Sequence, residues 1–138
     1  MDDDTRQRGR QVYDELLPWN AGAPADDGAF GGELRALSLD YPFGAIWSRP
    51  GLARRDRSLA LLGMLIALRA TNELRVHFRV AKVNGLTETE IAEVIYQASA
   101  YCGFPAAASA RGVAREVFEA DAAAGGTPGA AAKPGVQV

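Results

Sequence analysis

Hydrophobic residues recur at helical spacing along most of this chain. Apolar side chains repeat every three or four residues, and no alternating apolar run bounded by turn residues suggests a strand. The pattern therefore predicts an all-α protein. The expected helices cover roughly residues 4–17, 33–41, 53–69, 71–85 and 105–120, with a further helix that begins after Thr87.

Turn and cap residues divide these helices. The segment 40–52, "DYPFGAIWSRPGL", carries two prolines and two glycines between its aromatic residues, so we expect it to turn the chain while its aromatics pack onto the fold or line a pocket. Gly85 is a typical helix stop, and Thr87 with Glu90 three residues later predicts a capping box.

The end of the chain differs from the rest. Residues 121–138 have no helical period and no large apolar residue before Val136, which is typical of a disordered tail. We therefore interpret residues 1–120 as one helical domain. A chain of 138 residues, 48% of them hydrophobic, fits one domain with a modest core.

The segment 53–69 is polar only in its first turn and then apolar on all sides. A helix without a polar face must be buried on all sides. Because a domain this small has few other elements to bury it, we expect one side of this helix to lie in a subunit interface. The longest apolar run, residues 58–68, is shorter than the roughly 20 residues that a membrane span requires. We interpret it as a buried helix and expect no membrane partner.

Charge and cysteine content exclude further classes. The net charge of −2, with arginines spread among acids, does not favour binding to nucleic acid. The single cysteine, Cys102, has no intramolecular partner for a disulfide, and the acidic first residues are unlike a signal peptide. These features predict a cytoplasmic protein.

The single histidine, His77, lies inside the helix expected over residues 71–85. At about 100° per residue, Glu73, His77 and Asn84 fall together between two apolar directions, where each needs a partner or a ligand. Glu73 lies one turn before His77, so we expect it to orient the ring and raise its pKa. Two interpretations stay open: a structural Glu–His pair that seals a helix junction, and a proton-transfer group.

A metal site is not expected around this histidine. The chain has no second histidine and one cysteine, and no pair of carboxylates stands beside His77 at ligand spacing. A zinc or iron site would need ligands from several subunits.

Three motifs carry a family resemblance. "FGAIWSRPGL", "ELRVHFRVAKVNG" and "YCGFPAA" follow one another within residues 41–118, and this stretch resembles the decarboxylase branch of the carboxymuconolactone decarboxylase family. The resemblance implies an all-α bundle of the alkylhydroperoxidase-D-like type that assembles as a homo-oligomer, a trimer or a hexamer. It also implies the decarboxylation of an anionic, carboxylated unsaturated lactone without a cofactor, because the lactone carbonyl accepts the electrons.

The same superfamily contains disulfide reductases, from which this chain departs. Their Cys-x-x-Cys pair would fall at Ala70 and Glu73, and their upstream catalytic glutamate at Ser58. Cys102 lies on a different helix. Peroxidase chemistry through a cysteine pair is therefore excluded.

The implied reaction assigns roles to residues. The site must supply an acid, cations for the carboxylates and walls that exclude water. The resemblance and the residue chemistry make His77, with Glu73, the candidate catalytic acid. Arg49 is the first candidate for binding the carboxylate, followed by Arg57 and Arg79. The expected walls are Tyr41, Phe43, Trp47 and Phe104.

One departure concerns the substrate. Decarboxylases of this branch commonly have an acid where this chain has Ala45. The substrate is therefore expected to be a carboxymuconolactone-like acid of aromatic catabolism or a larger, more apolar acid. In the second case the enzyme would be a decarboxylase, isomerase or ring-rearranging enzyme in a biosynthetic pathway. A non-catalytic oligomeric binding protein is a third interpretation.

Overall fold

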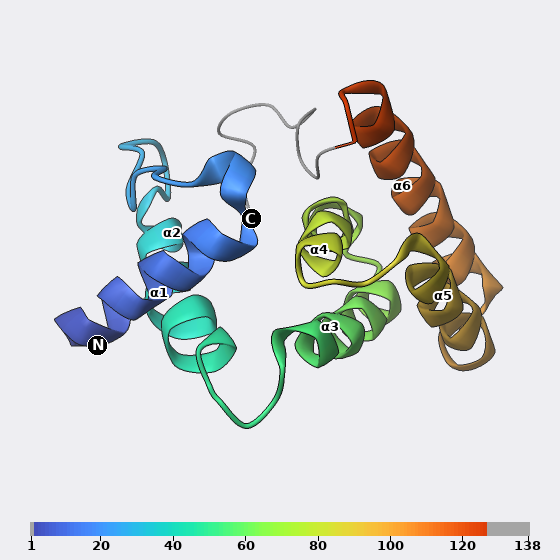
Figure 1. The fold of residues 1–138 in the computed structure, drawn as a ribbon, viewed down its shortest axis with the longest axis horizontal. Helices are drawn as coiled ribbons and strands as arrows, with labels where there is room; N and C mark the ends of the chain where they lie inside the picture. The colour runs from blue at the N-terminus through green and yellow to red at the C-terminus, as the bar shows by residue number, and fades with distance from the viewer. Residues whose placement is uncertain (1, 127–138) are drawn as a thin grey trace. The chain divides into compact units, whose positions relative to one another are not determined.

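A computed structural model describes residues 2–126, and all regular secondary structure in this range is helical (Figure 1). The all-α prediction is therefore confirmed. The helices are α1 (Asp3–Leu16), η1 (Pro18–Asn20), α2 (Glu33–Ser38), η2 (Leu39–Trp47), α3 (Arg54–Leu68), α4 (Thr71–Val83), α5 (Glu88–Cys102) and α6 (Phe104–Ala123). η1 is a 3₁₀-helix and η2 is a π-helix.

The described chain forms two compact units. The N-terminal unit ends at Ala53 and the C-terminal unit begins at Arg54. The expectation of a single domain over residues 1–120 stays a prediction. α6 runs to Ala123, into the segment predicted as a disordered tail, and residues 127–138 of that segment lie outside the described residues.

In the N-terminal unit, α1 packs closely against η2 because two glycines stand at the crossing. A Cβ atom on Gly9 would lie 1.9 Å from the carbonyl oxygen of Leu39, and one on Gly44 would lie 2.5 Å from that of Thr5. Neither position has room for a side chain. The Arg6 guanidinium donates to both carboxylate oxygens of Asp40, at 2.8 and 2.6 Å, and ties the same two helices together.

The π-helix is the main local difference from the predicted elements. The sequence predicts a helix over 33–41 and a turning segment over 40–52, whereas α2 ends at Ser38 and η2 follows it without a break. Pro42 inside η2 has no backbone N–H to donate, and its ring crowds the carbonyl four residues earlier. We attribute the wider turns of η2 to this residue, because an i→i+5 pattern relieves the crowding.

The C-terminal unit is a bundle of α3, α4, α5 and α6 around one hydrophobic core (Figure 1). Four alanines of α6 lie in this core and permit a close approach of its neighbours: Ala106, Ala107, Ala110 and Ala114. Their buried partners from the other helices include Leu62, Ile66, Leu74, Phe78, Ile91 and Ile95. These four helices agree with the predicted ones to within a few residues at each end.

The predicted capping box at the start of α5 is confirmed. The Glu90 amide donates to the Thr87 hydroxyl at 3.1 Å, and the Thr87 amide donates to a Glu90 carboxylate oxygen at 2.9 Å. The second oxygen of Glu90 accepts a hydrogen bond from Arg55 on α3. One carboxylate thus caps α5 and joins it to α3.

The predicted apolar character of α3 has a visible consequence. Its buried side includes Leu62, Leu65 and Ile66, yet Met64 is 59% exposed and Leu68 is 75% exposed on the other side. α3 therefore presents large apolar side chains away from the core of its own unit. Within residues 2–126, none of the helices is long and apolar enough to cross a membrane.

Candidate active site

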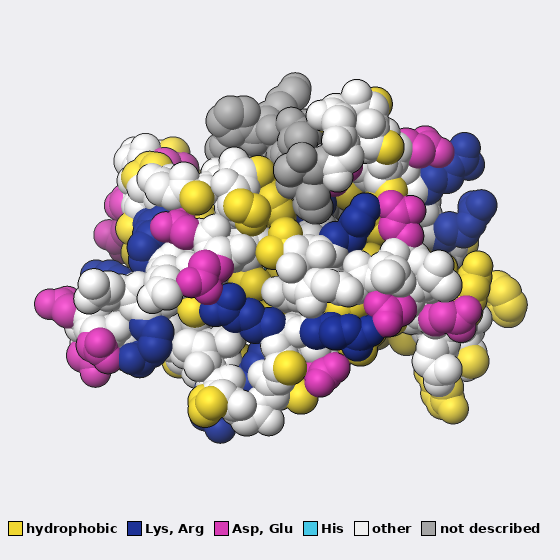
Figure 2. All heavy atoms as spheres, viewed as in Figure 1, with side chains coloured by type: hydrophobic (Ala, Val, Ile, Leu, Met, Phe, Trp, Pro, Cys, Tyr) yellow, Lys and Arg dark blue, Asp and Glu magenta, His cyan; other side chains and the backbone are white. Residues whose placement is uncertain are grey.

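His77 lies in the middle of α4 and is only 8% exposed. No histidine is visible on the face drawn in Figure 2. The neighbouring Leu74 and Phe78 face the hydrophobic core. The imidazole makes no hydrogen bond to any described residue. A buried polar ring in this condition has its donor and acceptor available to a ligand.

Burial controls the charge of this ring. It lowers the pKa of His77 from 6.5 to about 4, because the charged form loses its hydration without gaining a nearby carboxylate. Burial likewise raises the pKa of Glu73. The prediction that Glu73 raises the pKa of His77 is therefore wrong. The imidazole is neutral near pH 7 in the free protein.

Asn84, the third member of the polar stripe on α4, connects this helix to α3. Its side-chain amide donates to the Ser58 hydroxyl at 2.9 Å and to the Arg54 carbonyl at 3.4 Å. Ser58 is buried. The sequence placed Asn84 on the arc of His77, but its partner Ser58 depends on how α3 and α4 pack, and local spacing carries no signal of that.

The candidate arginines lie in different environments. Arg79 donates through Nε to both carboxylate oxygens of Asp121, at 3.1 and 3.0 Å, and Asp121 is 2% exposed. This ion pair joins α4 to α6 within the bundle. Arg57 is half-buried in the first turns of α3, and Arg49 is exposed just after η2.

The proposed aromatic walls divide into two kinds. Phe43 and Trp47 are buried on η2, and the Phe43 ring meets the Tyr13 ring edge-on at a centroid distance of 5.0 Å. Tyr41 and Phe104 are exposed. The structure therefore gives Phe43 a packing role in the core of the N-terminal unit.

The candidate site residues fall in both units. Glu73 and His77 come together on one helix of the C-terminal unit, which also contains Arg57, Arg79 and Phe104. The N-terminal unit contains Arg49 and the remaining three aromatics.

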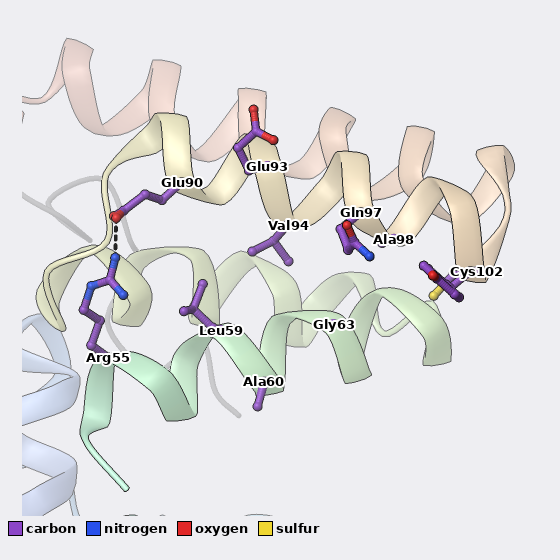
Figure 3. Close-up of a pocket in the computed structure, with 11 residues that line it drawn as sticks. Arg55, Leu59, Ala60, Gly63, Glu90, Glu93, Val94, Gln97, Ala98 and Cys102 are labelled. Carbon is purple, nitrogen blue, oxygen red and sulfur yellow. Dashed lines mark hydrogen bonds and ion pairs between the residues drawn. The ribbon is translucent and has the colours of Figure 1, made fainter.

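A groove between α3 and α5 has a volume of about 630 Å³ (Figure 3). The ion pair of Arg55 with Glu90 closes one end and Cys102 lies at the other, while Leu59 and Val94 line the apolar middle. His77 does not line it. The sequence did not single out this groove, because its walls come from two helices whose pairing only the fold defines.

Metal ligands are not clustered in this part of the molecule. Among residues 2–126, no three His, Cys, Asp or Glu side chains lie close enough together to hold one metal ion. The polar stripe on α4 itself contains one imidazole and one carboxylate.

Comparison with known proteins identifies the family. The model of the carboxymuconolactone decarboxylase family matches residues 32–116, more than half of the chain. The chain therefore belongs to this family. His77, Glu73, Ser58 and Asn84 all lie within the matched region.

Two decarboxylases are among its relatives. The 4-carboxymuconolactone decarboxylase of Acinetobacter baylyi is 44% identical over 79 residues, which cover 57% of this chain and 59% of the relative. The nitrosuccinic acid decarboxylase of Metarhizium robertsii is 46% identical over 69 residues, which cover 50% and 48%. An uncharacterized 15.0 kDa protein of Paracoccus denitrificans is 37% identical over 87 residues, which cover 62% and 65%. The matched part thus spans about half to two thirds of each relative.

Proposed function

We propose that this protein is a cofactor-independent decarboxylase of the carboxymuconolactone decarboxylase type. The observation that carries the proposal is the buried imidazole of His77, which has no hydrogen-bond partner among the described residues. A ring held in this way is available to a substrate and is partly shielded from water. The family match and the two related decarboxylases support the same reaction class.

The proposed substrate is a small acid whose carboxyl group stands in conjugation with an electron acceptor. In a 4-carboxymuconolactone-like acid the acceptor is the lactone carbonyl. The carbon–carboxylate bond breaks, carbon dioxide leaves, and the electron pair passes into the conjugated carbonyl. The resulting enolate then takes up a proton on a ring carbon.

His77 is the proposed source of that proton. The ring is neutral in the free protein, because burial lowers its pKa to about 4. An anionic substrate placed beside the ring favours the imidazolium form, so binding is expected to take up a proton. Glu73, one turn away and half-buried, is proposed to relay protons between solvent and the ring.

The carboxylate-binding group is proposed to be Arg49 or Arg57. Arg79 is less suited to this role, because Asp121 already occupies its Nε. Tyr41, Trp47 and Phe104 remain proposed walls.

Ala45 favours a second candidate substrate class. It is half-buried on η2 and replaces an acid that is common in this branch. A small apolar side chain there would accommodate a larger, more apolar acid, such as an aromatic or polyketide-type intermediate of a biosynthetic pathway. Decarboxylation, isomerisation or ring rearrangement of such a compound is the alternative activity.

The test is carbon dioxide release from a panel of carboxylated lactones, nitro acids and carboxylated aromatic compounds, with His77→Gln as the variant. We expect the variant to fold normally and to lose turnover by about 10²-fold or more, the usual scale for removing a general acid. Arg75→Gln on the same helix is the matched control, because Arg75 is exposed and pairs with Glu116 on α6, and it should keep its turnover.

Two results would contradict the proposal. A well-folded His77→Gln protein with near-normal turnover would remove His77 from the chemistry. Saturable binding of the acids without carbon dioxide release or any other product would instead favour a non-catalytic binding protein.

A further inference from the structure

The N-terminal unit contains a pocket of about 420 Å³ that none of the proposed chemistry uses. It lies between the chain that follows α1 and the helix α2. Its walls include Trp19, Asn20, Pro24, Asp27 and Arg35. Pockets of this volume are within the usual range for small-molecule sites.

Arg35 is the unusual member of this wall. The residue is only 9% exposed, and its single hydrogen bond within the described chain runs from Nη1 to the Pro24 carbonyl at 2.9 Å. No carboxylate of a described residue pairs with it. Its other guanidinium nitrogens are not among the fully buried polar atoms that lack a partner. Because the side chain lines the pocket, we infer that these nitrogens are accessible from it.

Two other arginines of this molecule have acidic partners. The exposed Arg6 donates through Nε and Nη2 to the two carboxylate oxygens of Asp40, and the half-buried Arg79 donates through Nε to both oxygens of Asp121. A guanidinium stays charged at all relevant pH values, and removing it from water is costly unless an anion compensates. Arg35 is therefore a largely buried cation that forms no ion pair with a carboxylate of the described chain.

Two neighbours narrow the class of anion. Asp27 lines the same pocket, and its negative charge opposes a doubly charged group such as phosphate. Trp19 offers an aromatic surface to the apolar part of a ligand. The planar fork of a guanidinium matches a carboxylate through two parallel hydrogen bonds.

We propose that this pocket binds a small, singly charged organic carboxylate with an apolar body, held by Arg35. All the walls named here belong to the N-terminal unit, so the proposal does not depend on the decarboxylase activity or on His77.

The experiment uses the full chain labelled with 5-fluorotryptophan. The chain has two tryptophans, of which Trp19 lines the pocket and Trp47 is buried on η2. Titration with benzoate should shift the fluorine resonance of Trp19 saturably and leave that of Trp47 in place. Benzyl alcohol is uncharged, and inorganic phosphate carries more negative charge than benzoate. Both should bind at least about 10-fold more weakly than benzoate.

Variants assign the effect to Arg35. Arg35→Met keeps much of the side-chain length and should weaken benzoate binding by about 10-fold or more. Arg8→Met, at an exposed arginine of α1 in the same unit, should bind benzoate as the unchanged protein does. Asp27→Asn removes the opposing charge and should strengthen the binding of phosphate relative to benzoate.

Three outcomes would overturn the proposal. They are equal benzoate affinity in a folded Arg35→Met protein, equal binding of benzyl alcohol and benzoate, and a Trp19 resonance that never saturates. If Arg35→Met does not fold, Asp27→Asn decides the matter: an unchanged preference between phosphate and benzoate would refute an anion site at this place.

Discussion

At the scale of single residues, the burial of His77 determines when its imidazole carries a charge. Its pKa falls from 6.5 to about 4 in the folded protein, whereas the unfolded chain keeps the ordinary value. Between these two pH values the unfolded chain binds a proton that the folded protein does not. Acidification through this window therefore favours unfolding.

This difference gives a prediction for stability. The His77 contribution to the free energy of unfolding is constant above about pH 6.5 and decreases as the pH falls toward 4, by about 2–3 kcal/mol at pH 4.5. Urea unfolding at pH 7.5 and pH 4.5 should show a smaller loss of stability in His77→Gln than in the unchanged protein.

The comparison isolates His77, because Glu73 is present in both proteins. The raised pKa of Glu73 acts with the opposite sign, since it favours the folded state as the pH falls. An identical pH dependence in the two proteins would show that the imidazole is not desolvated in the folded state.

Residue-level predictions from the sequence succeeded where they depend only on the spacing of residues within one helix. The spacing of Glu73, His77 and Asn84 placed them on one arc of α4, and the structure confirms a buried His77 there. The direction of the His77 pKa shift and the pairing of Arg79 with Asp121 were missed. Both depend on how the other helices pack against α4, and Asp121 lies 42 residues after Arg79 in the sequence.

At the scale of elements, the helix boundaries followed from caps and periodicity. Thr87 and Glu90 marked the start of α5, and the structure contains their two hydrogen bonds. The π-helix η2, whose wider turns we attribute to Pro42, was not predicted. A periodicity search for α-helices or strands does not register such a turn.

The junction between α5 and α6 yields a prediction about glycine. Gly103 has φ +90° and ψ 154°, a region that is essentially restricted to glycine. Gly103→Ala should therefore destabilise the protein by about 1–3 kcal/mol, although the nearest atom to an added Cβ is 3.7 Å away. Thermal or urea unfolding measures the change.

The matched control is Gly112→Ala, in the exposed interior of α6. No atom lies within 4 Å of an added Cβ there, and alanine is the better helix former. It should stabilise the protein by about 0.5–1 kcal/mol. Equal effects of the two substitutions would contradict the backbone conformation at Gly103.

At the scale of the whole molecule, exposed apolar side chains indicate association. α3 exposes Met64 and Leu68. A second group of hydrophobic side chains lies at the right-hand edge of the view in Figure 2, where α5 meets α6. Tyr101 and Phe104 are the large exposed residues of that junction. We propose that copies of this chain cover these faces in a trimer or a hexamer.

Sedimentation tests the assembly. The unchanged protein should sediment as an oligomer at micromolar concentration, and Leu68→Glu should shift it toward the 14.6 kDa monomer by placing a charge in the interface. Gln7→Glu, at an exposed position on α1, introduces the same charge as a comparison and should have a smaller effect. A clean monomer of the unchanged protein would refute the proposed interface.

The capping carboxylate of Glu90 has a consequence for local opening of the fold. Its two oxygens hold the first turn of α5 and the guanidinium of Arg55, which lies 35 residues earlier on α3. Opening of the first turn of α5 is therefore expected to release Arg55 from Glu90 as well. Backbone amides at the starts of these two helices should therefore exchange with deuterium as one cooperative unit, although a long stretch of chain separates them.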